Sequence, residues 1–259
     1  MKTFLISLFL LWFSTAGAAA PPDFQEAARR YEGLRPSAWG AHIPGVIGSF
    51  TPRGKELALT LDACGGRRGS GYDARLMDYL RVHRIPATLF ISARWALSNP
   101  LIFIRLARDP LFEIGNHGLL HRPCAVTPRS VYNIAATGSA AETLREIAES
   151  ERILMDLGAP RPRFFRSGTA YYDDVSIRIA GDLGYRVAGF TKAADGGATF
   201  KASLVYRNVT ASKAGSILLL HFNQPQSETR KGLTAALEHL RARGWRFLRL
   251  SDALDPRRR

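Results

Sequence analysis

Short apolar runs alternate along this chain with longer segments in which apolar residues recur at helical spacing. Seven runs have the length and composition of buried strands, and they cover residues 57–61, 87–92, 112–115, 164–165, 187–190, 217–220 and 246–250. Helices are expected over residues 24–31, 73–83, 100–107, 140–157, 175–183 and 229–243, with a weaker one within residues 201–212. The alternation predicts an α/β fold with about seven parallel strands, in a sheet that is closed or nearly closed.

Polar residues that can carry chemistry follow these apolar runs. The carboxyl ends of parallel strands meet on one face of such a fold, so residues scattered along the sequence can share one pocket. Six residues stand at positions of this kind: Asp62, His117, His121, Arg166, Asp195 and His221. The pattern therefore predicts a single active site at the carboxyl end of the sheet.

The start of the chain has the layout of a secretory signal peptide. Lys2 precedes an apolar run over residues 4–13, and small residues follow at positions 16–20. The run is short for a bilayer span, which disfavours the alternative of an uncleaved anchor. We expect residues 1–20 to direct export to the periplasm or the extracellular space, without stable membrane insertion.

The remaining length suits one domain with an extension. A chain of 259 residues with 46% hydrophobic content can bury one large core. Residues 21–54 are rich in Pro and Gly and are expected to wrap the domain, which covers residues 55–256. We expect a monomer.

The charge balance narrows the choice of partner. The chain has 36 Lys and Arg against 22 Asp and Glu, a formal net charge of +14. An exported protein meets little nucleic acid, and these basic residues are spread out, so anionic envelope polymers are the favoured partners. The alternative is a solubilising surface without a ligand.

The candidate site residues suggest complementary roles. His117 and His121 are four residues apart, so in a helix both imidazoles could face one cation, although packed histidines are the alternative. Asp62 would be costly to bury without a partner, and Arg166 is its natural counter-charge. Asp195 could orient His221 and raise its pKa so that it acts as an acid.

Five short motifs in order resemble the polysaccharide deacetylases that carry the NodB homology domain. The match spans residues 57–254. Leu59-Thr-Leu-Asp62, within a stretch reading TLDACGG, resembles the TFDDG motif, and Asn116-His117-Gly-Leu-Leu-His121 resembles the H(S/T)xxH motif. Phe165-Arg166, Asp195 and Leu218-Leu-Leu-His221 resemble the third, fourth and LxH motifs. The resemblance implies a distorted (β/α) barrel that removes acetyl groups from N-acetylated, less often O-acetylated, sugars of a polysaccharide.

The resemblance also implies roles for the residues. His117 and His121 would hold a divalent metal, with zinc expected, and Asp62 would take a proton from the attacking water. His221, tuned by Asp195, would protonate the departing amine. Arg166 would hold Asp62 in place and keep it ionised.

The first and third motifs depart from the family pattern. The second Asp of the first motif, which normally supplies a metal ligand, is Ala63 here. The metal site could be weak, Asp62 could enter it, or Cys64 could ligate as a thiolate. Arg166-Ser-Gly-Thr169 also lacks the expected Pro. A non-catalytic carbohydrate-binding member of the same fold is therefore the alternative function.

The only two cysteines, Cys64 and Cys124, each lie close to a motif residue. In an oxidising compartment this favours a disulfide that joins the first and second site loops. Free thiols and metal ligation by Cys64 are the alternatives, and a disulfide would exclude the latter.

Overall fold

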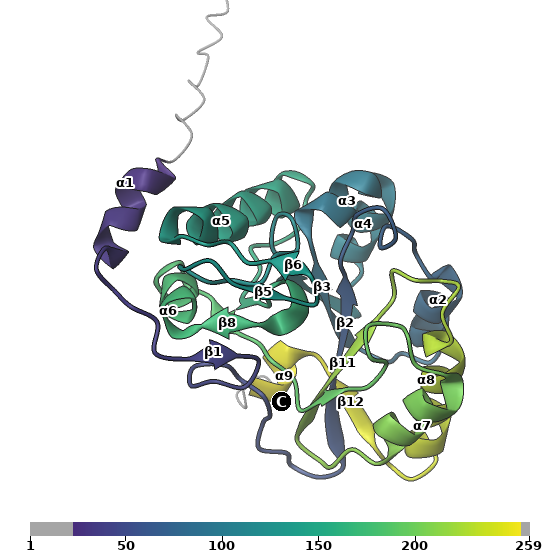
Figure 1. Cartoon of the computed structure of the whole chain (residues 1–259). Coiled ribbons are helices and arrows are strands. Elements are labelled where there is room, and N and C mark those ends of the chain that lie inside the picture. The colour runs from purple at the N-terminus through teal and green to yellow at the C-terminus, as the bar shows by residue number, and fades with distance from the viewer. Residues whose placement is uncertain (1–22, 255–259) are drawn as a thin grey trace, which may run out of the picture.

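A parallel sheet forms the centre of the molecule. The computed structural model describes residues 23–254, and Figure 1 shows the sheet curling between its covering helices. The strand order is β10-β11-β2-β3-β4-β7-β9, and β12 pairs with the first residues of β2. In this order the strands are β10 (Lys192–Ala193), β11 (Ser216–His221), β2 (Glu56–Ala63), β3 (Ala87–Ile91), β4 (Phe112–Asn116), β7 (Phe164–Phe165) and β9 (Arg186–Val187). The strand off this path, β12, covers Arg246–Leu248. The prediction of about seven parallel strands in a distorted (β/α) barrel is confirmed.

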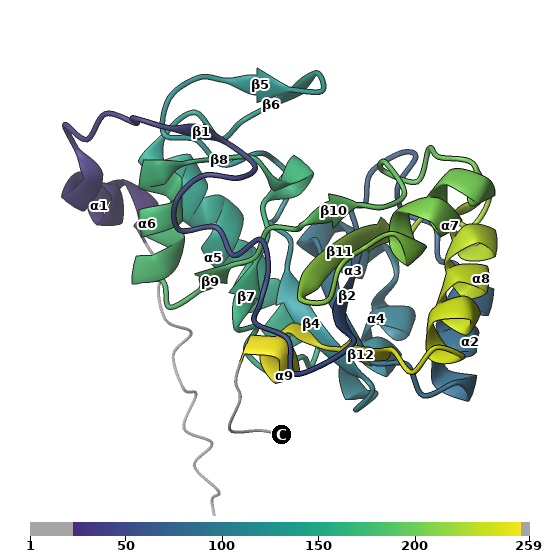
Figure 2. The same cartoon turned by 90° about the horizontal axis from the view of Figure 1, so that it is seen from below.

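Nine α-helices lie within residues 23–254, and most of them cover the outer face of the sheet. They are α1 (Phe24–Ala28), α2 (Ala74–Val82), α3 (Ala93–Ser98), α4 (Pro100–Arg108), α5 (Ala140–Asp156), α6 (Asp174–Asp182), α7 (Ala202–Thr210), α8 (Thr229–Arg241) and α9 (Leu250–Leu254). Figure 2 shows α2, α7 and α8 on one side of the molecule and α5 and α6 on the other. Short 3-10 helices lie at η1 (Arg29–Tyr31) and η2 (Gly168–Ala170).

The residues of β2 alternate between two environments. Leu59, Leu61 and Ala63 belong to the core cluster between sheet and helices. Ala58 belongs to a different cluster inside the curl of the sheet. Because successive strand residues point to opposite faces, Thr60 and Asp62 share the inner side with Ala58. The carboxyl end of β2 therefore directs Asp62 into the barrel.

The extension wraps the domain, as Figure 2 shows. Its strand β1 (Trp39–Gly40) pairs antiparallel with β8 (Tyr172–Asp173). Ile47 bridges to Ala188 beyond β9, and Ser49 bridges to Ser216 of β11. Residues of the extension thus connect the two sides of the curled sheet at its open seam.

Several short elements were not predicted. They are α3, α9, β10 and the hairpin of β5 (Ser130–Val131) and β6 (Ile134–Ala135), besides the β1–β8 pair. The predicted strand over residues 187–190 is shorter in the structure, since β9 ends at Val187.

The predicted signal peptide, residues 1–20, lies outside the described residues. Between residues 23 and 254, no helix combines the length and apolar composition that crossing a bilayer requires.

Candidate active site

Asp62 and Arg166 form a buried ion pair at the centre of the site. Arg166 Nη1 donates to Asp62 Oδ1 at 2.7 Å, and neither side chain is more than 3% exposed. Burial disfavours the ionised carboxylate, but the Arg166 guanidinium holds the pKa of Asp62 below its usual range. The predicted counter-charge is therefore in place, and Asp62 is a carboxylate at neutral pH.

Three further hydrogen bonds and one aromatic ring hold the guanidinium of Arg166. Its Nε donates to the carbonyl of Ala188 at 3.1 Å, and Nη2 donates to that of Gly189 at 2.7 Å. Nη1 also donates to Thr60 Oγ1 at 2.9 Å, and the guanidinium lies 4.1 Å from the ring centre of Phe90. These contacts fix the position of the cation, and so of the carboxylate that it holds.

His117 has one engaged ring nitrogen and one free one. Nδ1 lies 2.7 Å from the carbonyl oxygen of Arg166, which can only accept, so Nδ1 carries the proton. Nε2 is buried without a hydrogen-bond partner in the described part of the chain, and Asp62 Oδ2 lies 3.7 Å from it. Burial lowers the pKa of His117 to about 4. The imidazole is thus neutral, with the Nε2 lone pair available to a metal.

His121 reaches the same place from a loop, so the two imidazoles meet without the helical turn that would have brought them together. β4 ends at Asn116, and residues 117–121 form no helix. Gly118 and His121 both have positive φ, and the two imidazole centres lie 4.7 Å apart. The left-handed backbone at these positions turns the loop back over the sheet, so the rings meet without helical spacing.

The loop of His121 is held by Glu146, which the sequence analysis missed. Glu146 is buried on α5, and its Oε1 accepts the N–H groups of Leu120 and Arg122, each at 3.0 Å. Burial raises the pKa of Glu146, and these two N–H groups oppose that rise. A carboxylate on the buried face of an amphipathic helix was the available signal, because such a group needs a polar partner.

Cys64 and Cys124 form no disulfide, so that prediction was wrong. The Cys64 thiol lies within 4.8 Å of ring nitrogens of His117 and His121. Cys124 is buried in a separate cluster with Phe165 and Tyr172. The two thiols lie near the same motifs along the chain but occupy different environments.

The environment of Cys64 favours its thiolate. Burial opposes the charge, but His121 and His221 together lower the pKa of Cys64 to about 6. The carbonyl of Cys64 accepts from Ser92 Oγ at 2.8 Å and from Arg94 Nε at 2.7 Å, which fixes the backbone at this point.

His221 and Asp195 meet as predicted. His221 Nδ1 lies 3.0 Å from Asp195 Oδ1, and the backbone N–H of His221 donates to Asp195 Oδ2 at 2.8 Å. Thr229 Oγ1 donates to the same Oδ2 at 3.0 Å. Burial lowers the pKa of His221, but the attraction of Asp195 outweighs it and raises that pKa well above the ordinary value. His221 is therefore protonated at neutral pH, and it is the register partner of Asp62 on the neighbouring strand.

The altered third motif packs tightly against the loop that carries His121. A Cβ on Gly168 would lie 2.1 Å from the carbonyl oxygen of His121, so only glycine fits there. Thr169 and Ala170 have φ of 65° and 55°. For a β-branched residue this is a strained conformation, and strain of this kind gathers at functional sites.

The donor set fits a divalent metal. The ligand atoms of Cys64, His117 and His121 all lie within 4.8 Å of one another. The free Nε2 of His117 supplies a buried lone pair, and thiolate with imidazole is a ligand combination that zinc accepts. Asp62 is committed to Arg166 and lies beside this group rather than in it.

The chain belongs to the polysaccharide deacetylase family, whose sequence profile matches residues 50–188. The match includes Asp62, His117, His121 and Arg166 and ends before Asp195 and His221. A peptidoglycan-N-acetylglucosamine deacetylase of Bacillus cereus is 25% identical over 187 residues, which cover 71% of this chain and 82% of that protein.

Solved structures share the fold at low identity. A CE4 family pseudoenzyme from Bacillus anthracis gives a TM-score of 0.68 at 21% identity, over 83% of this chain and 70% of that one. A family 4 carbohydrate esterase from Bacillus subtilis gives a TM-score of 0.67 at 19% identity, over 82% of this chain and 86% of that one.

Proposed function

We propose that this protein is an exported, metal-dependent hydrolase that removes acetyl groups from N-acetylated sugars of an envelope polysaccharide. One observation carries the proposal: an ionised Asp62 and a protonated His221 stand at the ends of adjacent strands beside the free Nε2 of His117. Amide hydrolysis needs a base for the water and an acid for the departing amine, and these two groups have the required protonation states.

The residues divide the reaction between them. A divalent ion held by His117 and His121 would polarise the acetyl carbonyl and acidify the attacking water. Asp62 accepts the proton of that water, and Arg166 keeps it ionised and in place. His221, held by Asp195, donates a proton to the departing amine, so that amide and water give amine and acetate.

A groove beside the site supports a glycan with acidic groups. It has a volume of about 510 Å³ and is formed by the loops that follow Cys64 and His221. No acidic residue lines it, and its lining residues are Arg67, Arg68, Ser70, Gly71, Asn223, Gln224, Pro225 and Gln226. Amide and hydroxyl groups suit sugar hydroxyls, and guanidinium groups suit carboxylates. We extend the proposal to an anionic polysaccharide that reaches this groove.

Export is supported by the composition of residues 1–20. Their Lys2, apolar run and small residues form the three parts that a secretory signal requires.

A second candidate function is a non-catalytic glycan-binding protein of the same fold. The observation in its favour is Ala63, which stands where the family's first motif has a second Asp and whose methyl group packs in the core. A pseudoenzyme among the structural neighbours has the same fold. This candidate keeps the groove but lacks acetate release.

Acetate release distinguishes the two candidates. Purified protein would be given N-acetylglucosamine oligomers and peptidoglycan after chelation and again after zinc is restored. For a hydrolase, we expect acetate release that depends on zinc and is lost in Asp62→Asn. Zinc-loaded protein that binds these glycans without releasing acetate would establish the second candidate instead.

A further inference from the structure

The position of Cys64 follows from the alternation of β2. Ala63 points to the helix layer, whereas Asp62 points into the barrel. The residue after Ala63 returns to the inner side, because successive residues of an extended chain face opposite ways. Cys64 accordingly lies beside the imidazoles of His117 and His121.

A buried ring nitrogen of His117 marks the place of a ligand. Nε2 of His117 has no hydrogen-bond partner among residues 23–254, although the side chain is only 1% exposed. A buried polar nitrogen without a partner destabilises the fold, so such an atom calls for a partner that the protein itself does not supply.

The distances suit a shared ion. The donor atoms of Cys64, His117 and His121 lie within 4.8 Å of one another. Zinc bonds of about 2.3 Å to sulfur and about 2.0–2.1 Å to nitrogen put tetrahedral ligands roughly 3.3–3.6 Å apart. The remaining gap is at most about 1.5 Å.

We propose that the Cys64 thiolate is the third protein ligand of the metal site. It replaces the carboxylate that the family's first motif has at the position of Ala63. The inference rests on the proposed function only in placing a metal at the two histidines. Coordination releases the thiol proton to solvent, and the ligand set keeps one negative charge. A sulfur ligand shifts the preference of the site toward zinc, cobalt and cadmium and away from magnesium and calcium.

Cobalt spectroscopy tests the ligand directly. Apo-protein titrated with Co²⁺ should develop a near-ultraviolet sulfur-to-cobalt charge-transfer absorption that saturates at one ion per chain. Cys64→Ser should lose this absorption, whereas the matched variant Cys124→Ser should keep it. Zinc affinity of Cys64→Ser should fall on the order of 100-fold, at least as much as the loss of a group that orients a ligand.

Two further measurements keep the test decisive. Cys64→Asp should bind zinc without the absorption at cobalt, which separates a lost ligand from a collapsed loop. Zinc should also protect Cys64 of the native protein from iodoacetamide.

Equal alkylation with and without zinc, or cobalt bound without the absorption, would overturn the assignment. A stable acetyl thioester on Cys64 after exposure to substrate would likewise assign it as a nucleophile instead. None of the metal readouts requires acetate release. The ligand assignment can therefore fail or succeed independently of the proposed hydrolysis.

Discussion

The carbonyl oxygen of Arg166 accepts the Nδ1 proton of His117 at 2.7 Å, while the side chain of Arg166 binds Asp62. One residue therefore orients both a candidate metal ligand and the candidate base. The carbonyl fixes the tautomer that leaves Nε2 of His117 free, and the guanidinium fixes the carboxylate beside it. The two groups are placed relative to each other by the backbone and the side chain of one buried residue.

Replacing Arg166 by Met should destabilise the fold strongly. The substitution leaves the carboxylate of Asp62 buried without its cation, and breaking a buried pair in this way costs about 3–5 kcal/mol. Urea unfolding of the two proteins measures the difference. The matched variant Arg152→Met removes an exposed pair with Asp156 and should cost less than about 1 kcal/mol. Similar losses in both variants would contradict the importance of the buried pair.

Asp62→Asn should abolish most of the activity and leave the metal in place. An amide cannot accept the water proton, and loss of a general base lowers kcat by about 10²–10⁴-fold. Acetate release and zinc content should be measured on the same samples. Asp78→Asn, a matched change at an exposed site on α2, should leave both unchanged.

The sheet was predictable because its strands are buried on both faces and read as short apolar runs. β2 and β11 are buried along nearly their whole length, so most of their residues are apolar. The six predicted site residues also converge, since each stands near the carboxyl end of a strand or in the loop beyond it. Two-residue strands such as β10, and the β5–β6 hairpin, are too short to leave a periodic signal.

Loops were the least predictable part of the site, because spacing along the chain does not fix the direction of a side chain there. His121 meets His117 through a left-handed turn rather than a helix. Cys64 and Cys124 flank the same motifs, but one thiol faces the imidazoles and the other a separate core cluster. Strand alternation from Asp62 would have placed Cys64 on the inner side, which is the better guide to its partners.

Asp195→Asn should move the alkaline limb of the pH profile to lower pH. His221 acts as an acid, so the active form is the protonated one, which is present below its pKa and lost as the pH rises through it. Asp195 raises that pKa, and without its charge the effect of burial, which lowers the pKa, prevails. The check is kcat/KM as a function of pH. An unchanged alkaline limb would remove His221 from the role of acid.

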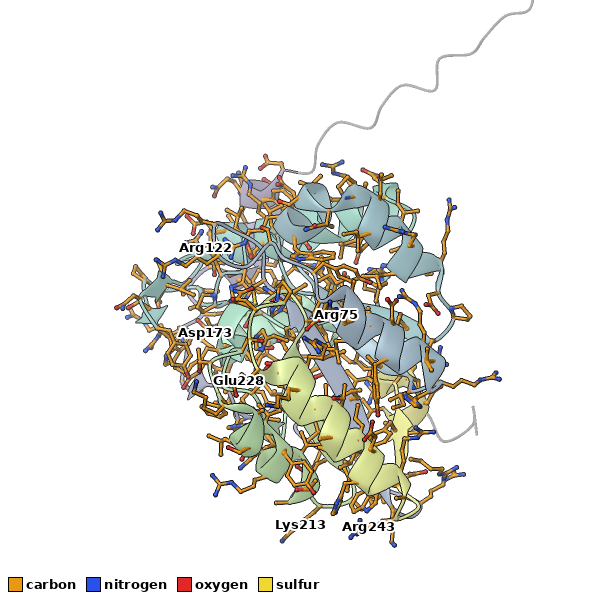
Figure 3. All side chains as sticks on the ribbon, turned by 90° about the vertical axis from the view of Figure 1, so that its right-hand side faces the viewer. Arg75, Arg122, Asp173, Lys213, Glu228 and Arg243 are labelled. Atoms are coloured by element: carbon orange, nitrogen blue, oxygen red, sulfur yellow. The ribbon has the colours of Figure 1, made fainter. Side chains whose placement is uncertain are left out.

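The groove should distinguish acidic from neutral glycans. Arg67→Ser with Arg68→Ser removes two guanidinium groups from the groove, and exposed ion pairs contribute about 0.2–1 kcal/mol each. The KM for a carboxylate-bearing N-acetylated glycan should rise about 2- to 30-fold, less so at high salt, and the KM for neutral oligomers should not change. Lys213→Ser with Arg243→Ser is the control, because neither residue lines the groove and Figure 3 shows both at the opposite end of the view from Arg122. An equal rise for neutral oligomers would contradict recognition of charge.

Glu146 should determine metal affinity without touching the metal. Its carboxylate accepts the N–H groups of Leu120 and Arg122, on either side of His121. Glu146→Ala leaves both donors unsatisfied and frees the loop, so zinc affinity should fall about 10–100-fold, the usual effect of losing a group that orients a ligand.

The conservative variant and a neighbouring site show whether this effect is specific. Glu146→Gln keeps an oxygen acceptor in the same place and should retain most of the affinity. Glu149→Ala, on the same helix but paired with Arg145, should bind zinc as the native protein does. Zinc titration should be accompanied by melting curves of the metal-free proteins. If Glu146→Ala lowers the melting temperature but binds zinc with native affinity, Glu146 only stabilises the fold, and the loop positions His121 without it.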